Sequence, residues 1–198
     1  MEYIENFDLE QALNSFKPHD DIEEAHVQKL RHFINGDQNI FSRQNLEGHI
    51  TGSGFLMTSD LSKILLTHHA KLGKWFQFGG HSDDDSNTKR VAARETIEES
   101  GIEAIHPLVS GIFDIDIHKI PENIKKQEPS HYHYDIRFMF ATDQQQFIVS
   151  DESNDLKWFT LDEFVNTVEQ SPDNMRFAQK WALMQKSQEK RGSDEFSK

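Results

Sequence analysis

A helix with acidic side chains on one face is the strongest structural signal in this sequence. The stretch from Asn87 to Ile102 reads N-T-K-R-V-A-A-R-E-T-I-E-E-S-G-I. Gly101 stands where a helix ends in a left-handed residue, and Asn87 or Thr88 can cap the start by accepting an early backbone N–H. About four helical turns fit between these ends. The stretch therefore predicts a helix whose start and stop are both fixed locally.

The predicted helix gathers its carboxylates on one side. Glu95, Glu98 and Glu99 stand at i, i+3 and i+4 and share a face, whereas Ala93 and Ile97 point the opposite way. Carboxylates this close repel by about 3 kcal/mol per pair at an effective dielectric constant of about 20. A divalent cation removes the repulsion, and clustered oxygen ligands suit Mg²⁺ or Mn²⁺. A solvated surface helix with an ordinary acidic face is the alternative.

This helix and the loop before it resemble the Nudix box, G-x5-E-x7-R-E-U-x-E-E-x-G-U, in which U is a bulky apolar residue. The positions that match in register are Gly80, Arg94, Glu95, Glu98, Glu99, Gly101 and Ile102. Two positions depart from the box, since Ser86 stands at the first glutamate and Thr96 at the first U. Outside the box, Phe78 stands where many relatives have proline.

The resemblance implies a fold, an α/β/α sandwich with a mixed β-sheet. In this fold a strand leads into a glycine-bearing loop and then into the helix. The sequence agrees, because strand patterns run from His49 up to Gly80, just before the helix. Gly79 and Gly80 lack a Cβ, so their backbone can approach a metal or phosphate closely. We expect three segments: an N-terminal helical extension over residues 1–45, the main domain over 46–187 and a disordered polar tail over 188–198.

The resemblance also implies a reaction, the metal-dependent hydrolysis of a nucleoside diphosphate linked to another moiety. Mg²⁺ or Mn²⁺ would be held by Glu95, Glu98, Glu99 and the Gly80 carbonyl, and would neutralise charge that develops on the diphosphate. Arg94 is expected to orient Glu95. The general base would be Glu152, in the loop before a W-F strand, or one of the box glutamates. An exposed loop carboxylate is the alternative for Glu152.

The departures from the box favour a second hypothesis. In the family the first glutamate anchors the box arginine, so with Ser86 we expect Asp84 or Asp85 to pair with Arg94. If neither does, the helix would be less well oriented and the enzyme slow. Ser86 and Phe78 together favour a catalytically degenerate domain that binds a nucleotide as a sensor or interaction module. The D-x-D-x-N run beginning at Asp83 is not a calcium loop, because Thr88 replaces the required glycine.

A strand with one polar face follows the helix. In H-Y-H-Y-D-I-R-F-M-F, strict alternation puts four polar side chains on one face: His131, His133, Asp135 and Arg137. This face is either solvated or lines the cleft beside the acidic helix, where the side chains could bind phosphate or ribose. The H-x-H-x-D pattern could also bind zinc.

The extension before the first strand predicts two helices that Pro18 separates. Asp20 or Asp21 caps the second helix, and Gly36 ends it. The apolar positions expected to face inward are Leu9, Leu13 and Phe16 in the first helix, and Ile22, Ala25, Leu30, Phe33 and Ile34 in the second. These helices could pack on the core, shape a substrate pocket or form a dimer contact.

Charge and composition limit the partners. The 198 residues include 21 Lys plus Arg against 34 Asp plus Glu, a net charge of −13, and no cysteine. This field repels nucleic acid and anionic membranes, which disfavours RNA decapping, whereas a small diphosphate with a metal ion can bind. The lack of cysteine argues against isopentenyl diphosphate isomerase, a relative whose chemistry uses one. Without a signal-peptide pattern we expect a cytoplasmic protein, with a homodimer possible.

Overall fold

Among the described residues, helices lie at both ends of the chain, and helix α4 (Thr88–Ser100) separates two runs of strands. The computed structural model describes residues 1–198 except 1–3, 5, 37–38, 125–126, 151–152 and 196–198, and for 191–195 it describes the helical backbone alone. The elements are α2 (Leu9–Ser15), α3 (Asp21–Gly36), β1 (Gly48–Thr58), β2 (Lys63–His69), β3 (Trp75–Phe76), β4 (Phe78–His81), α4 (Thr88–Ser100), β5 (His106–Pro107), β6 (Asp114–Ile120), β7 (His131–Thr142), β8 (Ser153–Thr160), α5 (Leu161–Thr167) and α6 (Pro172–Glu195).

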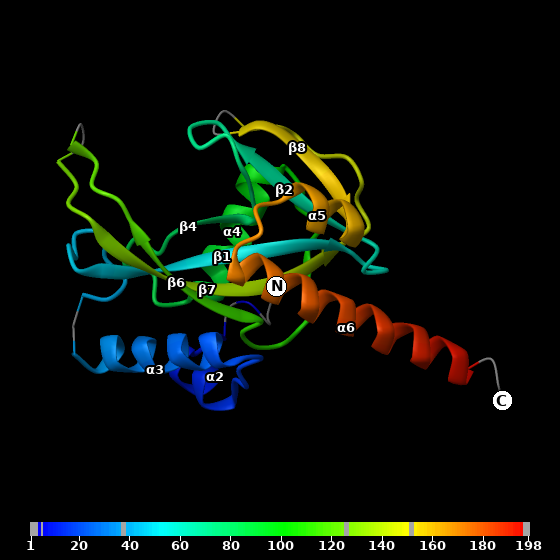
Figure 1. Ribbon diagram of the computed structural model, residues 1–198, viewed down its shortest axis with the longest axis horizontal. Coiled ribbons are helices and arrows are strands. Elements are labelled where there is room, and N and C mark those ends of the chain that lie inside the picture. The colour runs from blue at the N-terminus through cyan, green and yellow to red at the C-terminus, as the bar shows by residue number, and fades with distance from the viewer. Residues whose placement is uncertain (1–3, 5, 37–38, 125–126, 151–152, 196–198) are drawn as a thin grey trace.

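Two long parallel strands, β1 and β7, form the centre of the sheet. They pair from Gly48 with Tyr132 to Thr58 with Thr142. All other strand pairs are antiparallel, and the described strands make one eight-stranded mixed sheet. Along the first half of the central pair the order is β4-β1-β7-β6, and along the second half it is β2-β1-β7-β5. Figure 1 shows β6 and β7 reaching beyond the sheet as a long arm.

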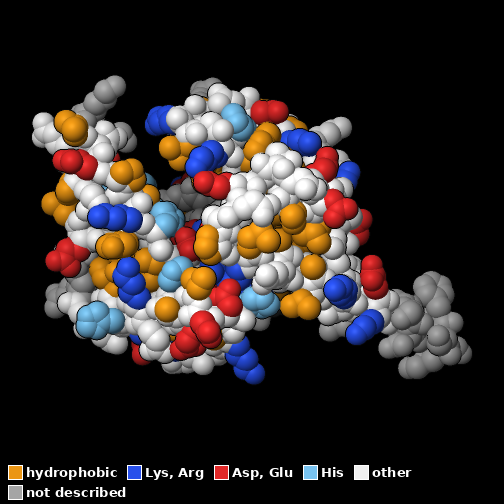
Figure 2. Space-filling model, viewed as in Figure 1, with side chains coloured by type: hydrophobic (Ala, Val, Ile, Leu, Met, Phe, Trp, Pro, Cys, Tyr) orange, Lys and Arg blue, Asp and Glu red, His pale blue; other side chains and the backbone are white. Residues whose placement is uncertain are grey.

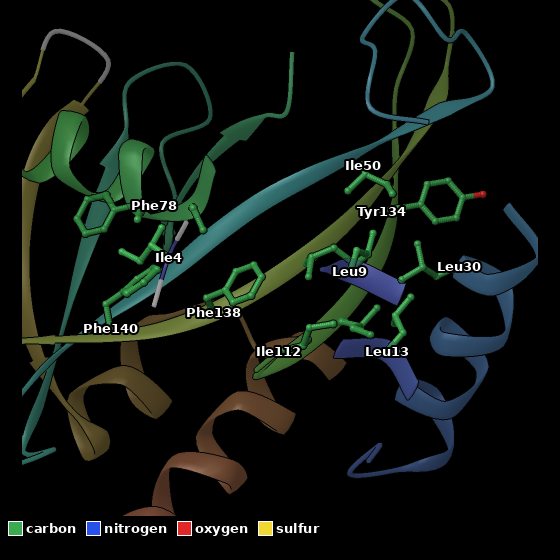
Figure 3. Close-up of a cluster of buried hydrophobic side chains, with 14 of the residues drawn as sticks. Ile4, Leu9, Leu13, Leu30, Ile50, Phe78, Ile112, Tyr134, Phe138 and Phe140 are labelled. Carbon is green, nitrogen blue, oxygen red and sulfur yellow. The ribbon is translucent and has the colours of Figure 1, made fainter. Parts of the chain in front are cut away.

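Alternate residues of the central strands enter two separate cores. Leu56 packs in the core under α2, α3 and α4, and its neighbour Met57 packs in the core under α5 and α6. Because successive side chains of a strand point to opposite faces, helices cover both faces of the sheet. Figure 3 shows the first core, which includes Phe138 and Phe140 of β7 and Leu9 and Leu13 of α2. The expected α/β/α sandwich with a mixed sheet is confirmed.

The N-terminal helices pack on the core, as one of the expected alternatives had it. Asp20 caps α3 by accepting a hydrogen bond from the Glu23 N–H at 2.7 Å. The predicted apolar face of α3 is partly wrong: Ile22 is 46% exposed and Glu23 is fully buried. The physical reason is that the Glu23 carboxylate has buried partners, since Lys180 and the Ile115 N–H both donate to it.

Helix α6 closes the second core. The fully buried Trp181 donates its indole N–H to the Leu61 carbonyl at 2.7 Å. The helix continues to Glu195, into the segment for which we expected a disordered tail. Figure 1 shows this end of α6 running away from the sheet. Within the described residues, no helix combines the length and apolarity needed to cross a membrane.

Candidate active site

The acidic helix α4 begins and ends where the sequence predicts. The Asn87 side chain accepts a hydrogen bond from the Arg90 N–H at 2.9 Å. At the other end, Gly101 has a φ of 68°, and its N–H donates to the Ile97 carbonyl at 2.8 Å. Asn87 also donates to the Ile4 carbonyl at 2.7 Å, which joins the start of α4 to the N-terminal segment.

The inner face of α4 lies directly on the backbone of β1. A Cβ on Gly52 would come within 2.6 Å of the Thr88 carbonyl, and a Cβ on Gly54 would overlap Oγ1 of Thr96. Thr96 is fully buried and donates to the Ala92 carbonyl at 2.7 Å, so its hydroxyl is satisfied within the helix. A threonine therefore fits this apolar position of the box. Ile97, expected on the buried face, is half-buried.

Gly80 and Glu95 form the closest contact between β4 and α4. A Cβ on Gly80 would lie 2.5 Å from Cδ of Glu95 and 2.6 and 2.7 Å from its two carboxylate oxygens. Only glycine leaves room for the carboxylate here. The half-buried Glu95 is thus held beside the backbone at the end of a strand, where carboxylate and carbonyl oxygens could bind one hard cation.

The other two box glutamates have different positions. Glu98 is exposed and lines the same cavity as Glu95. Glu99 accepts a hydrogen bond from the Gly79 N–H at 2.9 Å, so it fastens α4 to β4. Arg94 joins the other two carboxylates, with 2.8 Å to Oε1 of Glu95 and 3.1 Å to Oε2 of Glu98.

The prediction that Asp84 or Asp85 pairs with Arg94 is wrong. Asp85 is bound by Arg90 at 2.7 and 2.9 Å, and no hydrogen bond or ion pair joins Asp84 or Asp85 to Arg94 within the described part of the chain. The reason is geometric: Arg94 reaches carboxylates one residue and one turn further along its own helix. The loop is instead fixed at its start by Arg43, which binds Asp83 through two hydrogen bonds of 2.6 and 2.8 Å.

The carboxylates of Glu95 and Glu98 open onto a cavity of about 760 Å³. Its lining includes Gly80, Glu95, Glu98, Phe76, Asp135 and Asp173. Figure 2 shows this face hollowed between the β6–β7 arm and the part that carries β2 and β8, with acidic and histidine side chains inside. A cavity of this size can hold a nucleotide-sized ligand.

The polar face of β7 borders the cavity, because His133, Asp135 and Arg137 are among the residues that line it. Asp135 is 2% and Arg137 is 3% exposed. The Arg137 guanidinium contacts four carboxylates at 2.8 to 3.4 Å: Asp114, Asp116, Asp135 and Asp173. Substrate binding by Arg137 stays a prediction, and its guanidinium already has anionic partners.

The same charge network continues into the interior. Asp114 is fully buried between Arg137, Arg176 and Lys180, with hydrogen bonds of 2.7 Å from Lys180 and 2.8 Å from Arg176. Burial alone would raise the pKa of Asp114, but these three cations outweigh it and hold the pKa well below its ordinary value. The opposite shift occurs at Glu23, where burial and the charge of Asp114 raise the pKa.

Strand register adds site residues that the sequence did not single out. Ser53 and Thr51 of β1 pair with Arg137 and Asp135 of β7, and both hydroxyls donate to Oδ1 of Asp135, at 2.7 and 2.9 Å. His131 and His133 lie toward the other end of this face, half-buried. Alternation of polar residues in H-I-T-G-S resembles that in β7, but only the pairing of β1 with β7 brings the two sets together. The predicted base Glu152 lies outside the described residues.

A sandwich with a carboxylate-bearing helix set against a strand-end glycine defines the class of protein, an α/β domain of the Nudix type. The chain belongs to the NUDIX domain family, which it matches over residues 49–181. No curated protein matches it.

Solved structures share the fold at low sequence identity. The dihydroneopterin triphosphate pyrophosphohydrolase of E. coli is 13% identical, with 66% of this chain and 92% of that chain covered and a TM-score of 0.52. The Nudix hydrolase RenU of M. smegmatis is 15% identical, with 77% of this chain and 96% of that chain covered and a TM-score of 0.51. An Ap4A hydrolase of C. elegans is also 15% identical, with 68% of this chain and 96% of that chain covered and a TM-score of 0.50.

Proposed function

We propose that this protein is a metal-dependent hydrolase that cleaves a phosphoanhydride bond in a nucleoside diphosphate linked to another moiety. Examples of such a substrate are ADP-ribose, a nucleotide sugar and a nucleotide. The observation that carries the proposal is the carboxylate of Glu95 held against Gly80, with Glu98 beside it, at the wall of a cavity of about 760 Å³.

The donor set fits Mg²⁺ or Mn²⁺. Glu95, Glu98 and the Gly80 carbonyl offer the hard oxygen atoms that these ions prefer. The same set is anionic, so a cation relieves the repulsion between its carboxylates. Glu99, engaged with the Gly79 N–H, would position the loop in addition to any role as a ligand.

The proposed reaction is the attack of water on a phosphoanhydride bond. A water oxygen attacks one phosphorus, the bond to the bridging oxygen breaks, and a carboxylate takes up the water proton. When bound, Mg²⁺ or Mn²⁺ would neutralise the diphosphate and acidify the attacking water. Arg94 would orient Glu95 and Glu98, since it contacts both.

Glu152 is our candidate for the general base. Its neighbour Ser153 pairs with His69 across strands β8 and β2, and His69 lines the cavity. The segment that holds Glu152 therefore leads directly into a strand at the cavity wall. Glu152→Gln should lower kcat strongly and leave KM almost unchanged, whereas an exposed loop carboxylate would change neither.

The cavity lining supports a substrate with both an anionic and an aromatic part. Phe76 and Leu72 offer apolar surface on which a base could pack, in the same cavity as the carboxylates where cations would hold the phosphates. The hydrolysis of Ap4A by the C. elegans relative adds dinucleoside polyphosphates to the candidates.

The test is a substrate panel with purified protein and Mg²⁺ or Mn²⁺. The panel contains ADP-ribose, nucleotide sugars, dinucleoside polyphosphates and nucleoside triphosphates. We expect turnover of at least one class, and a loss of roughly 100-fold or more in kcat/KM for Glu98→Gln, because even outer-shell partners of a metal are worth ~10–100-fold. Glu103→Gln, an exposed glutamate just after the helix, is the matched control and should keep full activity. No turnover of any compound with either metal would contradict the proposal.

A degenerate, nucleotide-binding domain is the second candidate. Ser86 in place of the box glutamate favours it, together with the engagement of Arg94 by Glu95 and Glu98. A nucleotide that raises the melting temperature without being cleaved in the presence of metal would support this function. Metal-dependent product release would rule it out.

A further inference from the structure

Five histidines meet at one end of the cavity, where the first halves of β1 and β7 lie beside the second halves of β4 and β6. They are His49 of β1, His81 of β4, His118 of β6, and His131 and His133 of β7. Strand register explains the meeting: His133 pairs with His49 on one side and with His118 on the other, and His81 pairs with Thr51, two residues beyond His49. Their neighbouring rings have centroids 4.8 to 5.5 Å apart.

Three of these rings come close enough to share a ligand. His49, His131 and His133 each offer a ring nitrogen, and the three nitrogens lie within 4.8 Å of one another. Nitrogens bound to one zinc ion at about 2.0–2.1 Å lie roughly 3.4 Å apart in a tetrahedron. Small rotations of the rings would close this difference.

His49 is a buried polar group that lacks a partner. It is 2% exposed, and neither of its ring nitrogens makes a hydrogen bond of ordinary geometry among the described residues. Burial lowers the pKa of His49, and the Asn45 backbone raises it by a smaller amount. Nε2 of His133 is in the same situation. Buried polar groups are nearly always satisfied, so two unpartnered imidazoles at one point indicate that something else binds there.

His131 is already oriented as a ligand. Its Nδ1 lies 2.9 Å from the Pro129 carbonyl, to which it must donate, and this leaves the lone pair of Nε2 free. Metal-binding histidines commonly donate their second N–H to a carbonyl or carboxylate in this way.

Burial lowers the pKa of two of these rings. Burial lowers the pKa of His49 to about 4, helped by His81 and His131. Burial lowers the pKa of His133 to about 2, and the nearby histidines add to the effect.

From this geometry we infer that His49, His131 and His133 form a second metal site, for a transition-metal dication that prefers imidazole, with Zn²⁺ the best match. The ligand type separates it from the carboxylates of α4, because nitrogen ligands suit Zn²⁺ and oxygen ligands suit Mg²⁺ or Mn²⁺. His133 lines the cavity, so a position left open on the ion would face the substrate space.

The test is a titration of the full chain with Co²⁺ in excess Mg²⁺, which occupies the carboxylate site. A tetrahedral Co²⁺ site absorbs visible light far more strongly than an octahedral one. We expect one equivalent of strongly absorbing Co²⁺ that Zn²⁺ displaces. His131→Ala should weaken binding by more than about 100-fold, since a ligand is worth more than an outer-shell partner.

Three variants complete the test. Glu98→Gln removes a carboxylate and His32→Ala removes an exposed histidine of α3, and both should keep the Co²⁺ spectrum. His49→Ala should lose it while circular dichroism shows the native fold, and if this variant does not fold, His133→Ala and the half-exposed His131→Ala provide the result. Absence of the spectrum in the unmodified chain, its persistence in His131→Ala, or its loss in Glu98→Gln would overturn the proposal.

Discussion

Asp114 and Arg176 form a fully buried ion pair, in which Nε of the arginine donates to Oδ1 of the carboxylate at 2.8 Å. The pair joins the edge strand β6 to helix α6. Arg137 and Lys180 contact the same carboxylate, so Asp114 takes part in ion pairs with three cations.

Replacing this acid should destabilise the protein strongly. Asp114→Asn removes the carboxylate that Arg176 and Lys180 share, and we expect a loss of about 3–5 kcal/mol in the free energy of unfolding, as when one partner of a buried ion pair is removed. Urea denaturation at neutral pH measures it. Asp143→Asn, at an exposed position just after β7, is the matched control and should change stability by less than about 0.5 kcal/mol. A small effect at Asp114 would mean that the network contributes little.

Acid should destabilise the fold through Asp116. Burial alone would raise the pKa of Asp116, but Arg137 and His118 hold it well below its ordinary value. The charged groups around it also include His26, Arg176 and Asp135. In the unfolded chain this carboxyl takes up a proton at a pH of about 3.9, so the unfolded state binds more protons just below that pH and stability falls.

Asp116→Asn lacks this linkage. Its free energy of unfolding should therefore decrease less than that of the unmodified protein between about pH 5 and about pH 2.5. Denaturation curves at four pH values in this window give the two slopes. Equal slopes would show that Asp116 does not titrate differently in the two states.

Gly80→Ala should separate metal binding from stability. The new Cβ would lie 2.5 to 2.7 Å from the Glu95 carboxylate, which is the movable end of a side chain, so the carboxylate swings away and the fold survives. We expect Mn²⁺ affinity, measured by electron paramagnetic resonance, to fall by ~10–100-fold, with a small change in melting temperature.

Gly36→Ala is the control for that substitution. Nothing lies within 4 Å of its added Cβ, and the residue is the last of helix α3. Both Mn²⁺ affinity and melting temperature should stay close to those of the unmodified protein. Unchanged Mn²⁺ binding in Gly80→Ala would contradict the proposed role of Glu95.

Gly54 and Thr96 should be energetically coupled. Gly54→Ala places a Cβ onto Oγ1 of Thr96 and 3.0 Å from the Phe140 ring, and such overpacking costs about 1–3 kcal/mol. Thr96→Ala removes the overlapping oxygen. The double variant should therefore be more stable than the sum of the two single effects by at least about 0.5 kcal/mol, and strict additivity would disprove the contact.

The local sequence was sufficient to predict the elements that depend on local rules. The cap at Asn87, the left-handed Gly101, the break at Pro18 and the alternation of β7 are all set by residues within a few positions of one another. Their conformations follow from backbone sterics and capping, which do not need the rest of the chain.

Contacts between distant segments were harder to predict. Asp84 and Asp85 were the nearest acids to Arg94 in the loop, yet Asp85 binds Arg90. The burial of Glu23 could not be foreseen, because its partner Lys180 stands 157 positions further along the chain.

The sequence by itself determined the acidic helix, its glycine neighbour and the family to which they belong, because spacing along a helix fixes which side chains share a face. Only the tertiary structure decided that Arg137 is enclosed by carboxylates and that five histidines meet beside the cavity. Both depend on the register of β1 and β6 against β7, and a shift of one residue would turn every one of these side chains to the other face of the sheet.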